Sequence, residues 1–163
     1  MLKFIKKLFV KKNQPKSIGI TTYPDKIIFI SQYQIKNTYW ISSAEIEILE
    51  IDVSNDLIGK MICKQLSLSK YGIKMPNEIE LKEIKEKQNK ILKFKSIKDS
   101  MKNAKHIGII ELDGKIIFES SINGGSIGKN RGYSYLKEKI EVEINTDSES
   151  LGETYRKALE KCQ

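Results

Sequence analysis

Hydrophobic and polar residues alternate along several stretches of the chain, which is the pattern of half-buried β-strands. In the second half, the apolar stretches 107–112 and 115–119 flank Asp113-Gly114, a dipeptide that favours a tight hairpin turn. Residues 140–144 then alternate isoleucine or valine with glutamate. These patterns predict a β-hairpin followed by a third strand.

The first half repeats this order. Residues 17–31 align without a gap on residues 106–120, with 8 of the 15 positions identical. A third strand is predicted at 46–53, where Ile48-Leu49 interrupts the alternation and indicates a bulge. The chain is therefore predicted to contain two copies of one unit.

A helix is predicted to close each unit. Ser54 is the predicted N-cap of the first helix, and Thr146 to Glu149 have the spacing of a capping box before the second. Gly59 and Gly152 occupy the same early position in the two helices. Glycine costs about 1 kcal/mol against alanine inside a helix, so close packing against the sheet is the predicted reason for both.

A lysine-rich connector of residues 70–105 separates the copies. Asn77 is a predicted helix cap, and apolar residues then mark one helix face to about Lys93. A further helical turn or two is predicted through Ile97 and Met101. The predicted organisation is one domain over 1–163, with a basic N-terminal segment at 1–16, repeat one at 17–69, the connector, and repeat two at 106–162.

Charge is distributed unevenly along the 163 residues. The net charge is +8, yet the first 16 residues hold six lysines and no acid, so the other 147 carry +2 by subtraction. This concentration weakens an argument from the isoelectric point to nucleic-acid binding. The segment is either a membrane-surface helix or a frayed or core-docked terminus, and it lacks the features of a secretory signal. No apolar run is long enough to predict a membrane span.

The sequence gives little support for a catalytic function. The glycine-rich stretch 123–132 misses the spacing of a phosphate-binding loop, which indicates a flexible surface loop. His106 is the single histidine and is interpreted as a surface or edge residue, so no zinc site or catalytic triad is predicted. Cys63 is predicted to be buried and Cys162 exposed. We therefore predict no enzyme activity, no metal and no cofactor.

Two groups of side chains are candidates for partner binding. Basic and aromatic residues interleave in 129–137, and an aromatic pair lies in the corresponding region of the first copy. Such mixtures are typical of protein interfaces and of single-stranded nucleic-acid sites. Two glutamates of the 140–144 strand face outward. The candidate binding residues are Tyr39, Trp40, Lys129, Arg131, Tyr133, Glu141 and Glu143.

These elements resemble the immunity proteins of contact-dependent growth inhibition, the CdiI family. The resemblance lies in 148–159, with its acidic cap, Leu-Gly pair and Ala-Leu helix, following the strand 140–144. A weaker counterpart is Asp56-Leu57-Ile58-Gly59, continuing to Leu66 and Ser69. The resemblance implies a cytoplasmic protein that binds and blocks the C-terminal domain of one cognate toxin, and nucleases are the commonest such targets.

The predicted fold is α+β, with two hairpin–strand–helix units around a mostly antiparallel sheet and a helical connector. The predicted function is toxin neutralisation through protein–protein binding, with no small-molecule substrate. One departure from the family is the basic net charge, because inhibitors of basic nucleases are commonly acidic. The alternative function is nucleic-acid binding through the N-terminal segment and the 129–137 loop, which predicts affinity that falls steeply with salt.

Overall fold

The computed structural model describes residues 14–36 and 38–163, so nearly all of the predicted basic segment 1–16 lies outside the described residues. The strands are β1 (Lys16–Thr22), β2 (Lys26–Ile35), β3 (Trp40–Glu50), β4 (Lys70–Ile73), β5 (Lys105–Leu112), β6 (Lys115–Asn123) and β7 (Tyr133–Glu143). The helices are α1 (Asn55–Leu68), α2 (Glu78–Leu92), α3 (Ile97–Met101) and α4 (Ser148–Lys161).

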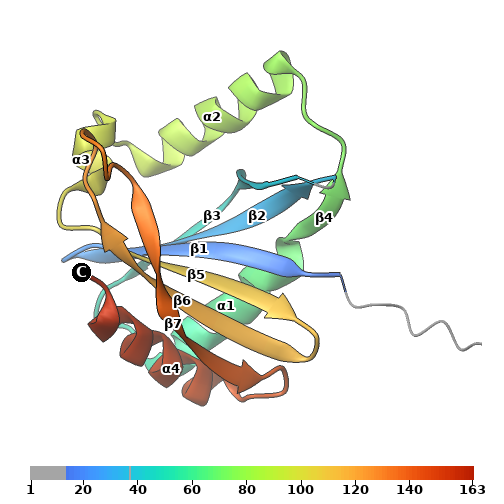
Figure 1. Cartoon of the computed structure of the whole chain (residues 1–163), viewed down its shortest axis with the longest axis vertical. Helices are drawn as coiled ribbons and strands as arrows, with labels where there is room; N and C mark the ends of the chain where they lie inside the picture. The colour runs from blue at the N-terminus through green and yellow to red at the C-terminus, as the bar shows by residue number, and fades with distance from the viewer. Residues whose placement is uncertain (1–13, 37) are drawn as a thin grey trace, which may run out of the picture.

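The predicted α+β class with a mostly antiparallel sheet is confirmed. The strand order is β3-β2-β1-β5-β6-β7, with antiparallel neighbours throughout, and the short β4 pairs in parallel with β2. Strands β1 and β5 meet at the centre, where Gly19 lies opposite Gly108. Helices α1 and α4 cover one face of the sheet (Figure 1). The internal duplication itself stays a prediction.

Tight turns form at the positions predicted from the sequence. Asp113 and Gly114 both have positive φ, at 48° and 80°, as a two-residue hairpin turn between right-twisted strands requires. Glycine adopts this conformation without a steric cost, and Asp tolerates it. The aligned turn between β1 and β2 is closed by a bond from the Tyr23 N–H to the Lys26 carbonyl at 2.8 Å.

The main core lies between the sheet and the two covering helices. Its largest fully buried side chains are Tyr155, Phe29 and Phe118, surrounded by isoleucines from β1 and β5. In each half a buried serine ties sheet to helix. Ser31 Oγ donates to the Gln65 carbonyl in α1, and Ser120 Oγ to the Ala158 carbonyl in α4, both at 2.7 Å. These bonds satisfy hydroxyls that would otherwise be buried without a partner.

The two helix glycines pack against the neighbouring helix, so the prediction that they pack against the sheet is wrong. A Cβ at Gly59 would lie 1.9 Å from the Ser148 carbonyl oxygen of α4. Reciprocally, a Cβ at Gly152 would lie 2.1 Å from the Asn55 carbonyl oxygen of α1. Each glycine therefore admits the first residue of the other helix, and α1 and α4 cross at their N-terminal ends.

Helix caps were predicted well, with one exception. Ser54 caps α1, and Asn77 forms a complete capping box with Glu80 at the start of α2. At α4 the cap is Asp147, whose carboxylate accepts from the Ser150 N–H at 2.9 Å. Thr146 lies one residue too early, and its hydroxyl donates instead to the Glu143 carbonyl at 2.7 Å.

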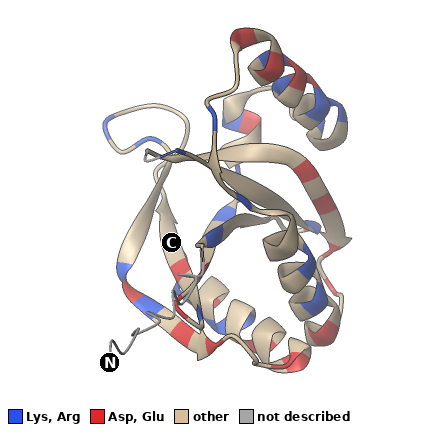
Figure 2. Cartoon of the chain, turned by 90° about the vertical axis from the view of Figure 1, so that its right-hand side faces the viewer, with Lys and Arg blue, Asp and Glu red and all other residues tan. Residues whose placement is uncertain are grey.

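Strand β3 differs from its prediction. It begins at Trp40 and continues to Glu50, and the irregularity in its pairing with β2 lies between Ile30 and Gln32, not at Ile48-Leu49. Helix α2 lies along this outer strand (Figure 1). The Gln88 side-chain Nε2 donates to two adjacent β3 carbonyls, those of Ser42 and Ser43, at 3.1 and 2.8 Å. The helix thereby covers part of the outer strand, and charged residues of both signs lie along its length (Figure 2).

The two cysteines were assigned the wrong way round. Cys63 is exposed on α1, and Cys162 is buried at the end of α4, where its thiol donates to the His106 carbonyl at 3.3 Å. Helical periodicity puts Cys63 beside apolar neighbours in sequence, but the buried stripe of α1 passes through Ile58, Met61 and Ile62. Within the described residues, no helix is long and apolar enough to cross a membrane.

Candidate functional site

The sheet face opposite α1 and α4 carries a group of interacting aromatic side chains, which we call the aromatic cluster: His106, Tyr133 and Tyr135. The rings of His106 and Tyr133 stack with centroids 4.6 Å apart. His106 Nε2 lies 3.3 Å from the Tyr135 hydroxyl, and its Nδ1 lies 2.9 Å from the Thr21 hydroxyl. Both imidazole nitrogens therefore have a hydroxyl partner, and strand β7 is attached to β5 and β1 through side chains.

The paired glycines at the sheet centre make room for this cluster. A Cβ at Gly19 would lie 3.0 Å from His106 Cε1, and one at Gly108 would lie 2.9 Å from the Tyr135 hydroxyl. The rings therefore lie flat over the backbone of β1 and β5. In each copy of the repeated Ile-Gly-Ile sequence, the glycine therefore leaves space for a ring on the sheet face away from the helices.

Burial shifts the ionisation of the cluster toward its neutral forms. Desolvation lowers the pKa of His106 to about 4 and raises the pKa of Tyr133 to about 12. Burial likewise raises the pKa of Tyr135, with a smaller contribution from the charge of Glu119. Near neutral pH the cluster is therefore uncharged and hydrogen-bonded. His106 is half-buried on β5, a central strand, so of the two predicted alternatives, a surface or an edge residue, the edge position is wrong.

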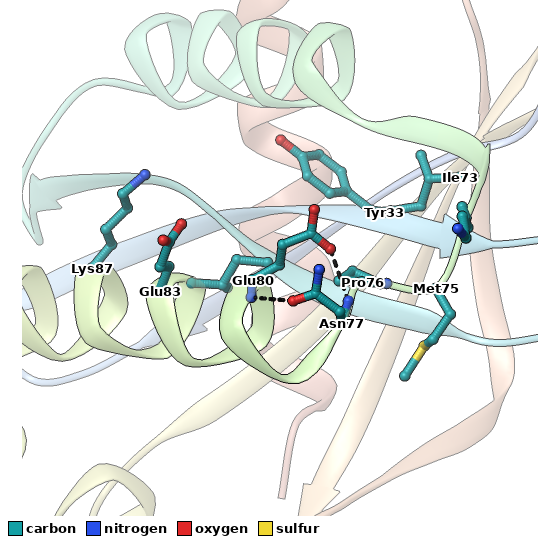
Figure 3. A pocket seen from close by; sticks show the side chains of 10 residues that line it. Tyr33, Ile73, Met75, Pro76, Asn77, Glu80, Glu83 and Lys87 are labelled. Atoms are coloured by element: carbon teal, nitrogen blue, oxygen red, sulfur yellow. Dashed lines mark hydrogen bonds between the residues drawn. The ribbon is translucent and has the colours of Figure 1, made fainter.

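A pocket of about 430 Å³ lies between β2, the β4–α2 link and the first turns of α2 (Figure 3). Tyr33 comes from β2, and Met75 precedes the capping box. The carboxylate of Glu80 is held by the Asn77 N–H at 2.8 Å, so this acid serves the helix start. Exposed Tyr39 donates to the Met75 sulfur at 3.7 Å beside the pocket.

The residues predicted for partner binding fall in three separate places. Tyr39 and Trp40 lie at the start of β3, beside the pocket of Figure 3. Lys129 and Arg131 are exposed in the β6–β7 loop, and Tyr133 begins β7 after that loop. All three of these residues lie at the other end of the sheet, since Trp40 pairs with the end of β2 and Tyr133 with the end of β6.

The two glutamates form the third place. Glu141 and Glu143 are exposed on β7, near the β5–β6 turn. Glu141 forms an ion pair with Lys115 at 2.7 Å, which lowers the pKa of the carboxyl. Glu143 lies ten residue steps along the strand from Tyr133, or roughly 33 Å at the usual rise per residue. The seven predicted residues therefore do not form one compact cluster, and their part in partner binding stays a prediction.

Sequence reasoning missed the aromatic cluster as a unit. Tyr133 and Tyr135 are two apart on a strand and share a face, a signal that was available. His106 joins them only because β5 and β7 are both neighbours of β6. That proximity depends on strand order, which a single sequence does not specify. Among residues 14–36 and 38–163, no group of three or more His, Cys, Asp or Glu is placed to hold a metal ion.

A profile of the CdiI family, described as CDI immunity protein, matches residues 16–162. The chain belongs to this family. The match covers β1 to the end of α4 and thus both halves of the sheet. The resemblance noted from 148–159 is confirmed as a family relationship. A comparison with curated proteins gives no match.

Two solved structures have the same fold as this CdiI family member. A Neisseria meningitidis protein of unknown function is 15% identical, with a TM-score of 0.77, over 93% of this chain and 98% of that one. A chain in the CdiA-CT/CdiI toxin and immunity complex from Yersinia pseudotuberculosis is 14% identical, with a TM-score of 0.70, over 92% of this chain and 98% of that one. At these identities the likeness is one of fold.

Proposed function

We propose that this CdiI family member binds the C-terminal domain of one cognate toxin and neutralises it in the cytoplasm. The observation that carries the proposal is the family match over 16–162. The similar fold found in a toxin and immunity complex supports it. Inhibition by binding needs a stable surface and no reacting group, and the sheet braced by α1 and α4 supplies such a surface.

The toxin is proposed to be a nuclease, as the family resemblance suggests. The immunity protein acts as a steric block: it occupies the toxin's substrate-binding surface, or it holds the toxin where substrate cannot enter. The basic net charge of +8 does not contradict this, because complementarity depends on the local patch that makes contact and not on the total.

The experiment is a co-purification of the tagged chain with the toxin domain encoded immediately upstream, followed by an activity assay. We expect a 1:1 complex that survives 500 mM salt, together with loss of nuclease activity at equimolar immunity protein. A non-cognate toxin domain is the control and remains active. Toxicity that persists despite a saturating amount of this chain refutes the proposal.

Nucleic-acid binding is the competing function. It was inferred partly from aromatic residues available for base stacking. One face of the Tyr133 ring is already stacked on His106, and Tyr135 lies over Gly108. These two tyrosines are therefore less available for stacking on nucleobases. The N-terminal lysines lie almost entirely outside the described residues.

A further inference from the structure

A strongly basic surface lies at the end of the molecule where α3 meets the β6–β7 loop. Residues 93–105 hold five lysines and one aspartate, and residues 124–132 hold one lysine, one arginine and no acid. These two segments together carry +6. Residues 17–163 carry only +2, so the rest of that region carries −4, the difference between the two. The basic patch and the acidic remainder thus largely offset each other and leave a net charge of +2 over residues 17–163.

Hydrogen bonds bring the two basic segments together. The Asn123 side-chain amide donates to the Met101 and Ala104 carbonyls at 2.8 and 2.7 Å, which fixes the base of the loop to the end of α3. The loop is closed by bonds from the Gly124 N–H to the Gly132 carbonyl and from the Gly132 N–H to the Gly125 carbonyl, both at 2.8 Å. Figure 1 shows α3 beside this loop.

A largely apolar pocket of about 540 Å³ opens beside these basic segments, a size typical of ligand pockets, which span roughly 300–1,000 Å³. Its walls include Ile28, Ile30, Leu92, Phe94, Met101 and Tyr133. Among the residues that the structure describes, Lys95 is the one charged residue in its lining. Ile97, which is 72% exposed, also lines the pocket. Ile127 is 84% exposed in the loop.

Given the proposed function, we infer that this surface is a toxin contact, and that its occupant is an acidic segment of the toxin domain that places an apolar side chain in the pocket. Charge complementarity argues for the acids, and the apolar walls argue for the side chain. Tyr23 packs on Phe94 with centroids 5.4 Å apart, and Lys26 lies over both rings. Because these rings are engaged, a protein side chain fits this pocket better than a stacked nucleobase.

The charge arm of the test uses the double variant Lys98→Glu/Lys129→Glu. The matched control is Lys82→Glu/Lys157→Glu, which changes net charge equally at exposed positions on α2 and α4. Association with the upstream-encoded toxin domain is measured by biolayer interferometry in 100 and 500 mM NaCl. We expect association of the first variant to slow by about tenfold in low salt, with the control near wild type. Equal rates for the two double variants overturn the charge argument.

The pocket arm compares Ile97→Ser with Ile79→Ser. Both isoleucines are 72% exposed and lie in the first turns of helices, but only Ile97 lines the pocket. We expect affinity for the toxin domain to fall roughly tenfold for Ile97→Ser alone, as removal of an apolar anchor at an interface does. Identical affinities for the two variants overturn the assignment of the pocket.

A single-stranded RNA oligonucleotide is the third probe. Loss of RNA binding in Lys98→Glu/Lys129→Glu, with toxin binding intact, identifies the surface as a nucleic-acid site and overturns the inference. If the wild-type chain does not bind the toxin domain at all, the proposed function fails and this inference fails with it. If the wild type binds and every variant binds equally well, the function stands and only the inference fails.

Discussion

The crossing of α1 and α4 leaves no room for a side chain at either helix glycine, and this makes Gly59→Ala a demanding test of the structure. The added Cβ would lie 1.9 Å from the Ser148 carbonyl oxygen, whereas ordinary contact begins at 3.4 Å. Relief therefore needs a local separation of about 1.5 Å, the difference between these two distances. The obstructing atoms belong to the backbone, so no rotamer change can provide that space.

The expected cost follows from two opposing effects. Overpacking a well-packed core typically costs about 1–3 kcal/mol, and a clash with backbone belongs at the upper end of that range. Alanine recovers about 1 kcal/mol through its better helix propensity. We expect Gly59→Ala to lower the free energy of unfolding by about 2 kcal/mol, equivalent to a fall in Tm of about 4–8 °C at this chain length.

The assay is urea denaturation followed by circular dichroism, applied to Gly59→Ala, Gly152→Ala and the double variant. Both substitutions are relieved by the same separation of the helices, so the double variant should lose less than the sum of the single losses. A single variant as stable as the wild type, or strictly additive losses, would show that the helices do not cross as described.

Three further predictions test other parts of the structure. Because the pKa of His106 is lowered to about 4 in the folded protein, the unfolded chain binds one more proton between about pH 6.5 and pH 4. The free energy of unfolding therefore falls as the pH falls through that window, by up to about 1.4 kcal/mol per pH unit. His106→Gln should flatten this pH dependence in denaturation curves. Gln88→Ala should loosen α2 from β3 at a cost of about 1 kcal/mol, visible as faster amide exchange in α2 with unchanged exchange in α4. A thiol reagent should modify exposed Cys63 in the folded protein, although partial desolvation raises the pKa of this thiol and slows the reaction, while buried Cys162 should react only on unfolding.

Local signals in the sequence predicted the parts of the fold that local physics controls. The Asp113-Gly114 turn and the Asn77 cap of α2 involve residues within three positions of each other, and both formed as predicted. The alternation of apolar and polar residues predicted most strands, because one face of the sheet is buried under α1 and α4. The short β4 gave no such signal, since four mostly exposed residues carry no periodic pattern.

Features that depend on tertiary contacts were not accessible in this way. The packing partner of Gly59 was assigned to the sheet because the sequence does not reveal the angle at which two helices cross. The burial of Cys162 requires α4 to end over β5, where the His106 carbonyl accepts its thiol proton. The aromatic cluster requires the strand order at the sheet centre. Each of these errors comes from a contact between segments far apart in the chain.

The spatial distribution of charge also depends on tertiary contacts, and it bears directly on function. Counted along the chain, the excess of lysine falls in the first 16 residues, and the remaining net charge of +2 looks unremarkable. Counted in space, residues 93–105 and the β6–β7 loop lie together and carry +6 beside a largely apolar pocket, because Asn123 holds the two segments together. An inhibitor recognises its target through such a local field. The basic total charge is therefore compatible with immunity, provided that the toxin presents acids where it meets this end of the sheet.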